Sequence, residues 1–149
     1  MGMFPMDDIM IALLPVNADW CTLDLPHLTL VYSGEIKDHS PGDYNVMAKD
    51  VASLAMLSSP ISLDVMGMDT LGPPDDRVSV LLLRPSIELL SMRNFVEKYD
   101  RSEYPDYKPH VTIGPRAPEG GSYPSHIFFD RLYIGWGEDE SLTFWMRNR

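Results

Sequence analysis

The sequence predicts an α+β domain in which an antiparallel sheet is packed by helices. Strand-like segments outnumber helix-like ones, and each of the two helix-like segments precedes a further strand. The chain has 149 residues, 44% of them hydrophobic, which fits one domain with a sizeable core. A short motif near the start recurs near the end, which indicates two similar lobes facing each other. We therefore expect one domain over residues 1–149.

The first half of the chain gives clear signals for each element. Residues 9–14 are apolar and end at a proline, as in a buried strand. A connector over 17–26 leads to a second strand over 27–32, which a turn at Gly34 ends. Ser40 and Asp43 mark the start of a helix. Its buried stripe is predicted from apolar side chains at spacings of three and four: Tyr44, Met47, Val51 and Leu54.

The second half alternates strands and one more helix. Residues 61–66 alternate in polarity and 78–83 are apolar, so they predict a hairpin around the Gly- and Pro-rich loop 72–76. A second helix begins at Pro85 and Ser86, with an apolar stripe of Leu89, Met92, Val96 and Tyr99. Strands follow over 110–113, 128–136 and 142–146. The Gly- and Pro-rich segment 114–124 is predicted to be a loop at the rim of the site.

Composition excludes several classes of function. The net charge of −10 would repel long nucleic acids, which recruit basic surfaces. A small nucleotide still fits, because a cleft can hold a few positive groups inside an acidic protein. The lone Cys21 cannot form an intrachain disulfide, which agrees with a reducing cytosol. No stretch has the character of a secretory signal or the length of a membrane span. We expect a soluble, cytoplasmic protein without a membrane partner.

Two stretches share the pattern Pro-His-x-Thr-aliphatic: residues 26–30 read PHLTL and residues 109–113 read PHVTI. The chain has 13 Pro and 4 His, so two such matches are far from chance, and we interpret them as an internal duplication. On a strand, residues i and i+2 share a face. Each motif therefore presents an imidazole beside a hydroxyl, anchored by aliphatic side chains on the other face.

Two imidazoles held across a cleft supply the groups that concerted acid–base chemistry needs. An unperturbed histidine titrates near pH 6.5. One of His27 and His110 can therefore accept a proton while the other donates one. The hydroxyls of Thr29 and Thr112 can donate hydrogen bonds to non-bridging phosphate oxygens. Cleavage of a phosphodiester beside a ribose 2′-hydroxyl needs this set of groups, and neither a metal nor a cofactor.

The paired motifs resemble the H-x-T signatures of the two-histidine (2H) phosphoesterases, which include LigT-type 2′-5′ RNA ligases and cyclic phosphodiesterases. The matching order of elements covers most of the chain, from residue 9 to residue 145. The resemblance implies a pseudo-symmetric bilobal fold, with antiparallel sheets lining a central cleft and helices packed outside. It also implies that His27 and His110 act as acid and base, in an order left open. Thr29 and Thr112 would bind the phosphate.

Some phage members of this family are similar to the chain in small size and in lacking appended domains. Among them are anti-CBASS nucleases, which hydrolyse the cyclic oligonucleotide signals of bacterial immunity; a phage protein of this kind would act in the host cytoplasm. LigT-like members usually carry more basic residues near the cleft, whereas here only Lys108 and Arg116 flank the second motif. We predict that both contribute to a substrate pocket, with Tyr107 as its wall.

The remaining candidates have simpler interpretations. His39 and His126 lack the motif and are predicted to be surface or packing residues. No third ligand is spaced near either motif, so we predict no metal site. Tyr32, Trp136 and Trp145 could stack on nucleobases, but packing in the core or at the rim is the simpler interpretation.

We therefore predict a metal-independent phosphodiesterase that cleaves 2′-5′ or 3′-5′ bonds of small linear or cyclic oligonucleotides. One alternative is a 2′,3′-cyclic phosphodiesterase or 2′-5′ RNA ligase acting on RNA ends. A second is a catalytically silent module that sequesters a nucleotide, against which the intact pairs of histidine and threonine argue. A third is an interaction protein whose motifs arose by chance. The sequence leaves the oligomeric state open.

Overall fold

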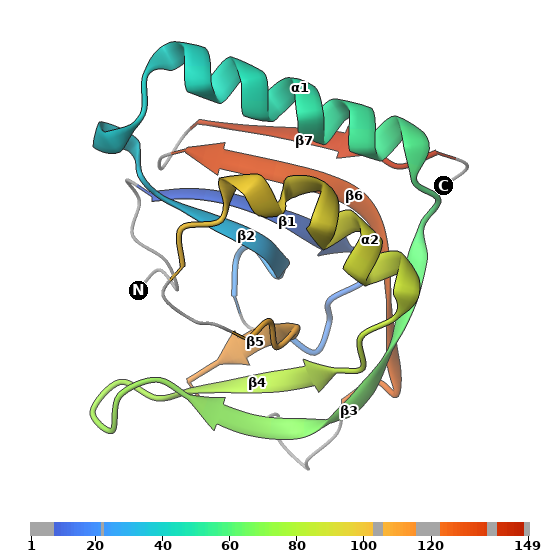
Figure 1. Ribbon diagram of the computed structural model, residues 1–149. Coiled ribbons are helices and arrows are strands. Elements are labelled where there is room, and N and C mark those ends of the chain that lie inside the picture. The colour runs from blue at the N-terminus through green and yellow to red at the C-terminus, as the bar shows by residue number, and fades with distance from the viewer. Residues whose placement is uncertain (1–7, 22, 103–105, 116–122, 137–139, 148–149) are drawn as a thin grey trace.

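The computed structural model describes residues 8–21, 23–102, 106–115, 123–136 and 140–147. They confirm the predicted α+β class (Figure 1). In chain order the elements are β1 (Asp8–Pro15), β2 (Leu28–Glu35), the 3₁₀ turn η1 (Ile36–Asp38), α1 (Pro41–Leu57), β3 (Ile61–Leu71), β4 (Val78–Leu83), α2 (Ile87–Val96), the 3₁₀ turn η2 (Glu97–Tyr99), β5 (His110–Gly114), β6 (His126–Trp136) and β7 (Ser141–Trp145).

The strands form one antiparallel sheet in the order β1-β2-β5-β4-β3-β6-β7, and β1 also pairs with β6. The long strand β6 belongs to both halves of this sheet. Its first residues pair with β3, and its later residues lie between β1 and β7. One lobe is therefore β2, β1, β7 and the end of β6, and the other is β5, β4, β3 and the start of β6. Figure 1 shows β6 curving from one lobe to the other. Each lobe contains one motif.

Both helices pack on the main hydrophobic core, to which strands β1 to β6 contribute buried side chains, while Phe144 of β7 packs against it. Ser40 caps α1 as predicted: its hydroxyl accepts from the N–H of Asp43, whose carboxylate accepts from the N–H of Ser40. The predicted stripes are buried at Met47, Val51 and Leu54 on α1 and at Leu89, Met92 and Val96 on α2. Their remaining members, Tyr44 of α1 and Tyr99 of η2, are half-buried. No helix in the described part of the chain is long and apolar enough to cross a bilayer.

The predicted hairpin is formed by β3 and β4 and projects from the body of the molecule (Figure 1). Gly72 lies in its loop with a φ of 105°. A Cβ at this position would lie 2.7 Å from the carbonyl oxygen of Asp76, so glycine satisfies both the positive φ and the close approach. The hairpin extends the second lobe beyond the motif strand β5, with which β4 pairs.

Candidate active site

The two motif strands meet at one position in the sheet. β2 and β5 form an antiparallel pair at Leu28 and Val111, and both side chains are fully buried in the main core. The neighbours of each residue along its strand therefore face the opposite side of the sheet. The two motifs thus present their polar positions on the same face, at the point where one lobe joins the other.

The four predicted site residues form a square on that face. The antiparallel register around the central pair sets His27 opposite Thr112, and Thr29 opposite His110. Residues that are directly opposite have Cβ atoms about 5 Å apart, and diagonal neighbours about 7–8 Å. The two histidines are diagonal neighbours, and His110 lies close enough to affect the ionisation of His27.

The two imidazoles are held in the same way. His27 Nδ1 lies 2.7 Å from the carbonyl oxygen of Leu25, and His110 Nδ1 lies 2.8 Å from that of Lys108. In each case the acceptor is the residue two positions before the histidine. A carbonyl oxygen can only accept, so each Nδ1 carries a proton and donates it. Nε2 is then the nitrogen that gains or loses a proton at each site.

The environment favours the neutral form of His27. Burial lowers the pKa of His27, the hydrogen bond to the Leu25 carbonyl opposes this effect, and the charge of the nearby His110 lowers the pKa further. An imidazole with a lowered pKa is neutral at pH 7 and has a lone pair on Nε2. His27 therefore has the protonation state of a general base.

The hydroxyl of Thr29 donates to the thioether of Met10, with 3.5 Å between Oγ1 and Sδ. A thioether is a weak acceptor, so a phosphate oxygen would compete for this hydrogen bond easily. Met10 belongs to a small buried cluster on this face of the first lobe, together with Ala12, Leu14 and Tyr133. Apolar packing thus fixes the position of the thioether that contacts Thr29.

Comparisons with known proteins identify the fold. No family model matches the chain, and no curated protein matches its sequence. Three solved structures superpose on almost all of it. E. coli LigT complexed with 3′-AMP gives a TM-score of 0.51 at 16% identity, over 95% of both chains. TT0787 of Thermus thermophilus gives 0.59 at 14%, over 94% of this chain and 95% of that one.

Usb1 of Kluyveromyces marxianus gives a TM-score of 0.61 at 11% identity, over 95% of this chain and 99% of its own. The chain has the 2H phosphoesterase fold. The resemblance inferred from the doubled motif is thereby confirmed at the level of architecture. Identities this low establish the fold, and the chemistry has to be argued from the side chains.

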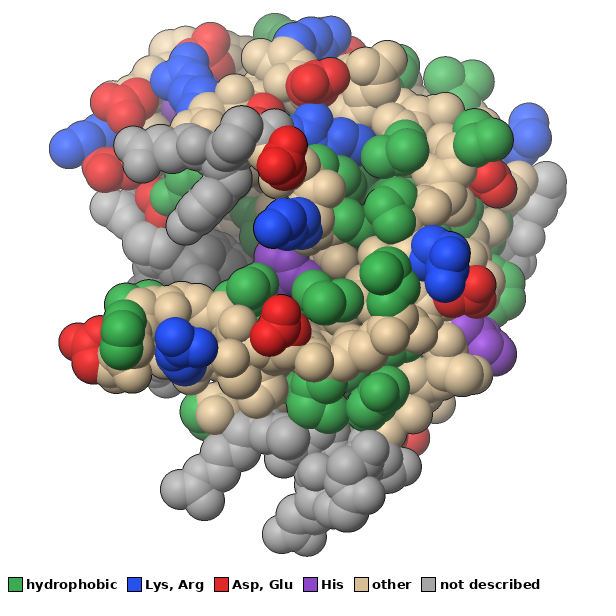
Figure 2. All heavy atoms as spheres, turned by 60° about the horizontal axis from the view of Figure 1, so that its bottom comes forward, with side chains coloured by type: hydrophobic (Ala, Val, Ile, Leu, Met, Phe, Trp, Pro, Cys, Tyr) green, Lys and Arg blue, Asp and Glu red, His purple; other side chains and the backbone are tan. Residues whose placement is uncertain are grey.

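The three predicted pocket residues of this 2H fold have different positions. Lys108 is exposed. Arg116 lies outside the described residues. Tyr107 is half-buried and packs against the main core, and its hydroxyl donates to the carbonyl of Thr29 at 2.8 Å. Figure 2 shows histidine atoms set back in a hollow between the projecting hairpin and the body, beside a basic side chain.

The residues predicted to be surface or packing residues are found in such positions. The buried side chain of His39 contacts the carbonyl of Ser33 through Nε2 at 2.7 Å, and His126 is exposed at the start of β6. Trp136 stacks on Tyr44, with 5.8 Å between ring centroids. Among the described residues, no group of three His, Cys, Asp or Glu side chains is arranged to hold a metal ion.

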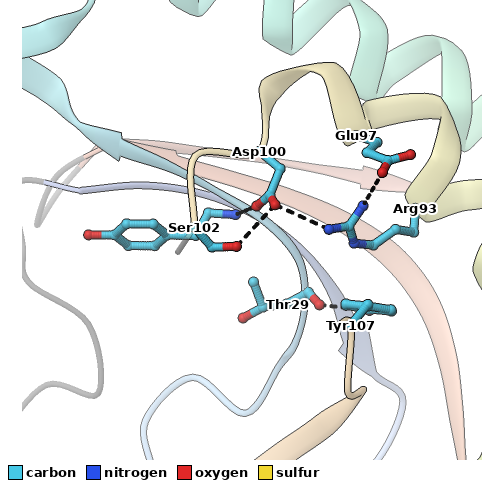
Figure 3. Close-up of polar contacts among 7 residues, drawn as sticks. Thr29, Arg93, Glu97, Asp100, Ser102 and Tyr107 are labelled. Atoms are coloured by element: carbon cyan, nitrogen blue, oxygen red, sulfur yellow. Dashed lines mark hydrogen bonds and ion pairs between the residues drawn. The ribbon is translucent and has the colours of Figure 1, made fainter. Parts of the chain in front are cut away.

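Sequence reasoning missed a cluster behind the first motif, centred on Arg93 of α2. Its guanidinium lies over the ring of Tyr107, 4.7 Å from the centroid. It also pairs with Asp100 at 3.2 Å and Glu97 at 3.8 Å. Figure 3 shows this cluster above the contact between Tyr107 and Thr29. The pair with Glu97 has the i,i+4 spacing that a sequence can indicate, but no sequence signal places the guanidinium over Tyr107, because only the fold brings these two residues together.

Proposed function

We propose that the protein is a metal-independent phosphodiesterase that uses two-histidine acid–base catalysis. The observation that carries this proposal is the square of His27, Thr29, His110 and Thr112, in which both imidazoles are held identically through Nδ1. A binding protein needs hydrogen-bond donors for a phosphate, but it does not need two proton-transfer groups aimed at the same place. General acid–base catalysis by each imidazole contributes about 10²–10⁴ in rate.

The surroundings assign a role to each histidine. We assign His27 as the general base, because burial keeps it neutral. It removes a proton from the attacking oxygen, a ribose 2′-hydroxyl or a water. As the new P–O bond forms, the bond to the departing oxygen breaks, and protonated His110 gives that oxygen its proton. His27 ends protonated and His110 neutral, and proton exchange with water restores both.

The threonine hydroxyls complete the chemistry. Negative charge grows on the non-bridging oxygens of the phosphoryl group during attack. Donors that are already in place stabilise this charge without having to reorganise. The two threonines occupy one diagonal of the square and the two histidines occupy the other. A phosphoryl group bound by both threonine hydroxyls would therefore have its phosphorus between the two imidazoles.

The substrate we propose is a small nucleotide with a 2′-5′ or 3′-5′ bond, linear or cyclic. The net charge of −10 disfavours long nucleic acids. The E. coli LigT structures include complexes with 3′-AMP, NADP+ and ATP, which supports a small nucleotide as the ligand of this fold. Degradation of a cyclic immune signal, as by anti-CBASS nucleases, is the most specific form of this proposal.

The test incubates the protein in EDTA with separate substrates: cyclic di- and trinucleotides, linear 2′-5′ oligoadenylate, and an RNA end with a 2′,3′-cyclic phosphate. Products are identified by mass spectrometry, and the double variant His27→Ala/His110→Ala serves as the blank. Cleavage of a cyclic or linear oligonucleotide supports the proposal. Cleavage of the RNA end alone supports the RNA-end alternative. Tight binding with intact ligand recovered on denaturation would replace catalysis by sequestration.

A further inference from the structure

The two motif strands are joined by more than their one backbone pair. Among the described residues, β2 and β5 pair only at their motifs. Beyond that point, two residues that precede β5 donate to backbone carbonyls of β2. The hydroxyl of Tyr107 donates to the carbonyl of Thr29 at 2.8 Å, and the N–H of Arg101 donates to the carbonyl of Tyr32 at 2.8 Å. A side chain that precedes the second motif therefore satisfies the backbone of the first.

Tyr107 is well placed to act as a fixed donor. Arg93 covers its ring, and the carboxylate of Asp100 holds the guanidinium of Arg93 in turn, at 3.2 Å. Asp100 also accepts from the hydroxyl of Ser102 at 3.0 Å, as Figure 3 shows. Burial raises the pKa of Tyr107, against the opposing charge of Arg93, so its hydroxyl keeps its proton at neutral pH.

A weaker contact of the same kind exists in the opposite direction. Cys21 lies in the connector before the first motif, and its Sγ donates to the carbonyl of Thr112 in the second motif at 3.5 Å. Burial raises the pKa of the Cys21 thiol, so the proton is retained. A thiol is a weak donor. The segment before each motif thus contacts the carbonyl of the other motif's threonine.

We propose that Tyr107 is a positioning residue that aligns Thr29 with the reacting phosphate, and that Cys21 is its weaker counterpart for Thr112. This inference rests on the proposed function, because alignment matters only if the threonines contact a phosphate. It gives Tyr107 a role different from the pocket wall that the sequence predicts. A donor displaced by a fraction of an ångström loses transition-state stabilisation more than ground-state binding.

The first variant is Tyr107→Phe, which removes the hydroxyl and keeps the ring beneath Arg93. We expect kcat to fall about tenfold with KM nearly unchanged. The matched control is Tyr99→Phe, which also removes a tyrosine hydroxyl from a hydrogen bond, here to Asp50 of α1. That variant should keep kcat. A fall in kcat of the same size in both variants would mean that the effect is general destabilisation.

Double-mutant cycles give the decisive result. Tyr107→Phe should cost little more in a Thr29→Ala protein, because the residue it aligns has lost its hydroxyl. It should cost its full tenfold in a Thr112→Ala protein. Cys21→Ala should lower kcat about twofold in the Thr29→Ala protein, as expected for loss of a weak donor, and should cost little more in the Thr112→Ala protein. Cys21→Ser keeps a donor at this position and should restore the activity. Equal losses in both threonine backgrounds would overturn the proposal.

A measurement without substrate separates this inference from the proposed function. In Tyr107→Phe the NMR order parameter of the Thr29 methyl group should fall, and in Tyr99→Phe it should not. Unchanged order at Thr29 would overturn the positioning role even in an active enzyme. If the wild-type protein cleaves nothing in the panel while Tyr107→Phe still shows the loss of order, the proposed function is overturned and the contact between Tyr107 and Thr29 is a structural one.

Discussion

The two motifs share a sequence pattern and a way of holding their histidines, but their surroundings differ. His27 immediately precedes β2, and burial lowers its pKa. His110 begins β5 and receives its Nδ1 contact from the backbone of the exposed Lys108. Thr29 is backed by a buried thioether and receives a strong donor at its carbonyl. The repeated motif thus supplies the shared geometry, and the different surroundings support the proposed division of roles.

The largest expected effect tests whether both motifs are catalytic. His27→Ala and His110→Ala should each lower kcat/KM by about 10²–10⁴, because each removes one proton-transfer group. The loss should appear in kcat, measured on the substrate found in the panel. His126→Ala is the matched control, since it removes an exposed histidine outside the motifs and should leave kcat/KM unchanged.

Thermal melting of these three histidine variants distinguishes catalysis from folding. All three should melt close to the wild-type temperature, because both motif histidines are only half-buried by surface area and His126 is exposed. Full activity in either motif variant would mean that the substituted histidine is not catalytic and that its motif has only a structural role. Such a result would leave the assignment of acid and base without support.

The threonines give the next largest effect. Thr29→Ala and Thr112→Ala should each lower kcat by about 10²-fold, as loss of one transition-state donor does in other enzymes. Thr→Ser at either position keeps the hydroxyl and should retain most of the activity, which makes it the matched control. If the alanine variants raise KM alone, the hydroxyls bind the ground state and transition state equally, and phosphate binding is their only role.

The sequence predicted four candidate site residues but not the contacts that hold them. The period of two in each motif is a local property, so it places His27 beside Thr29 and His110 beside Thr112 without further information. Helix caps such as Ser40 are equally local. All four residues lie on one face, however, because β2 and β5 pair at Leu28, and no local pattern sets that register.

The supporting contacts are further from the reach of a sequence argument. Tyr107 stood out because it precedes the second motif, yet its partner Thr29 belongs to the first. Arg93 contacts Tyr107 from α2, and Cys21 reaches the second motif from the connector before the first. The contacts of Tyr107 with Thr29 and of Cys21 with Thr112 join segments that are distant in the sequence. Their positions follow from the path of the chain between lobes, which periodicity does not encode.

The smallest effect concerns the ionisation of His27. Its pKa should lie below the ordinary value of about 6.5, and His110→Gln should raise it only part of the way back, because burial is a larger cause than the charge of His110. The neutral form is the base, so on the acid side of the pH profile kcat/KM in the wild type should fall as the pH drops below this lowered pKa. NMR titration of the His27 ring measures it directly, with His126→Gln as the control that should change nothing.

The lowered pKa of His27 also makes the stability of the folded protein depend on pH. Below about pH 6.5 the unfolded chain takes up a proton at His27 that the folded chain does not. Stability is therefore lost as the pH falls from that value through the folded pKa. His110→Gln should narrow this pH window without closing it. A wild-type His27 that titrates at or above 6.5 would remove the electrostatic difference between the motifs, and with it the assignment of His27 as the base.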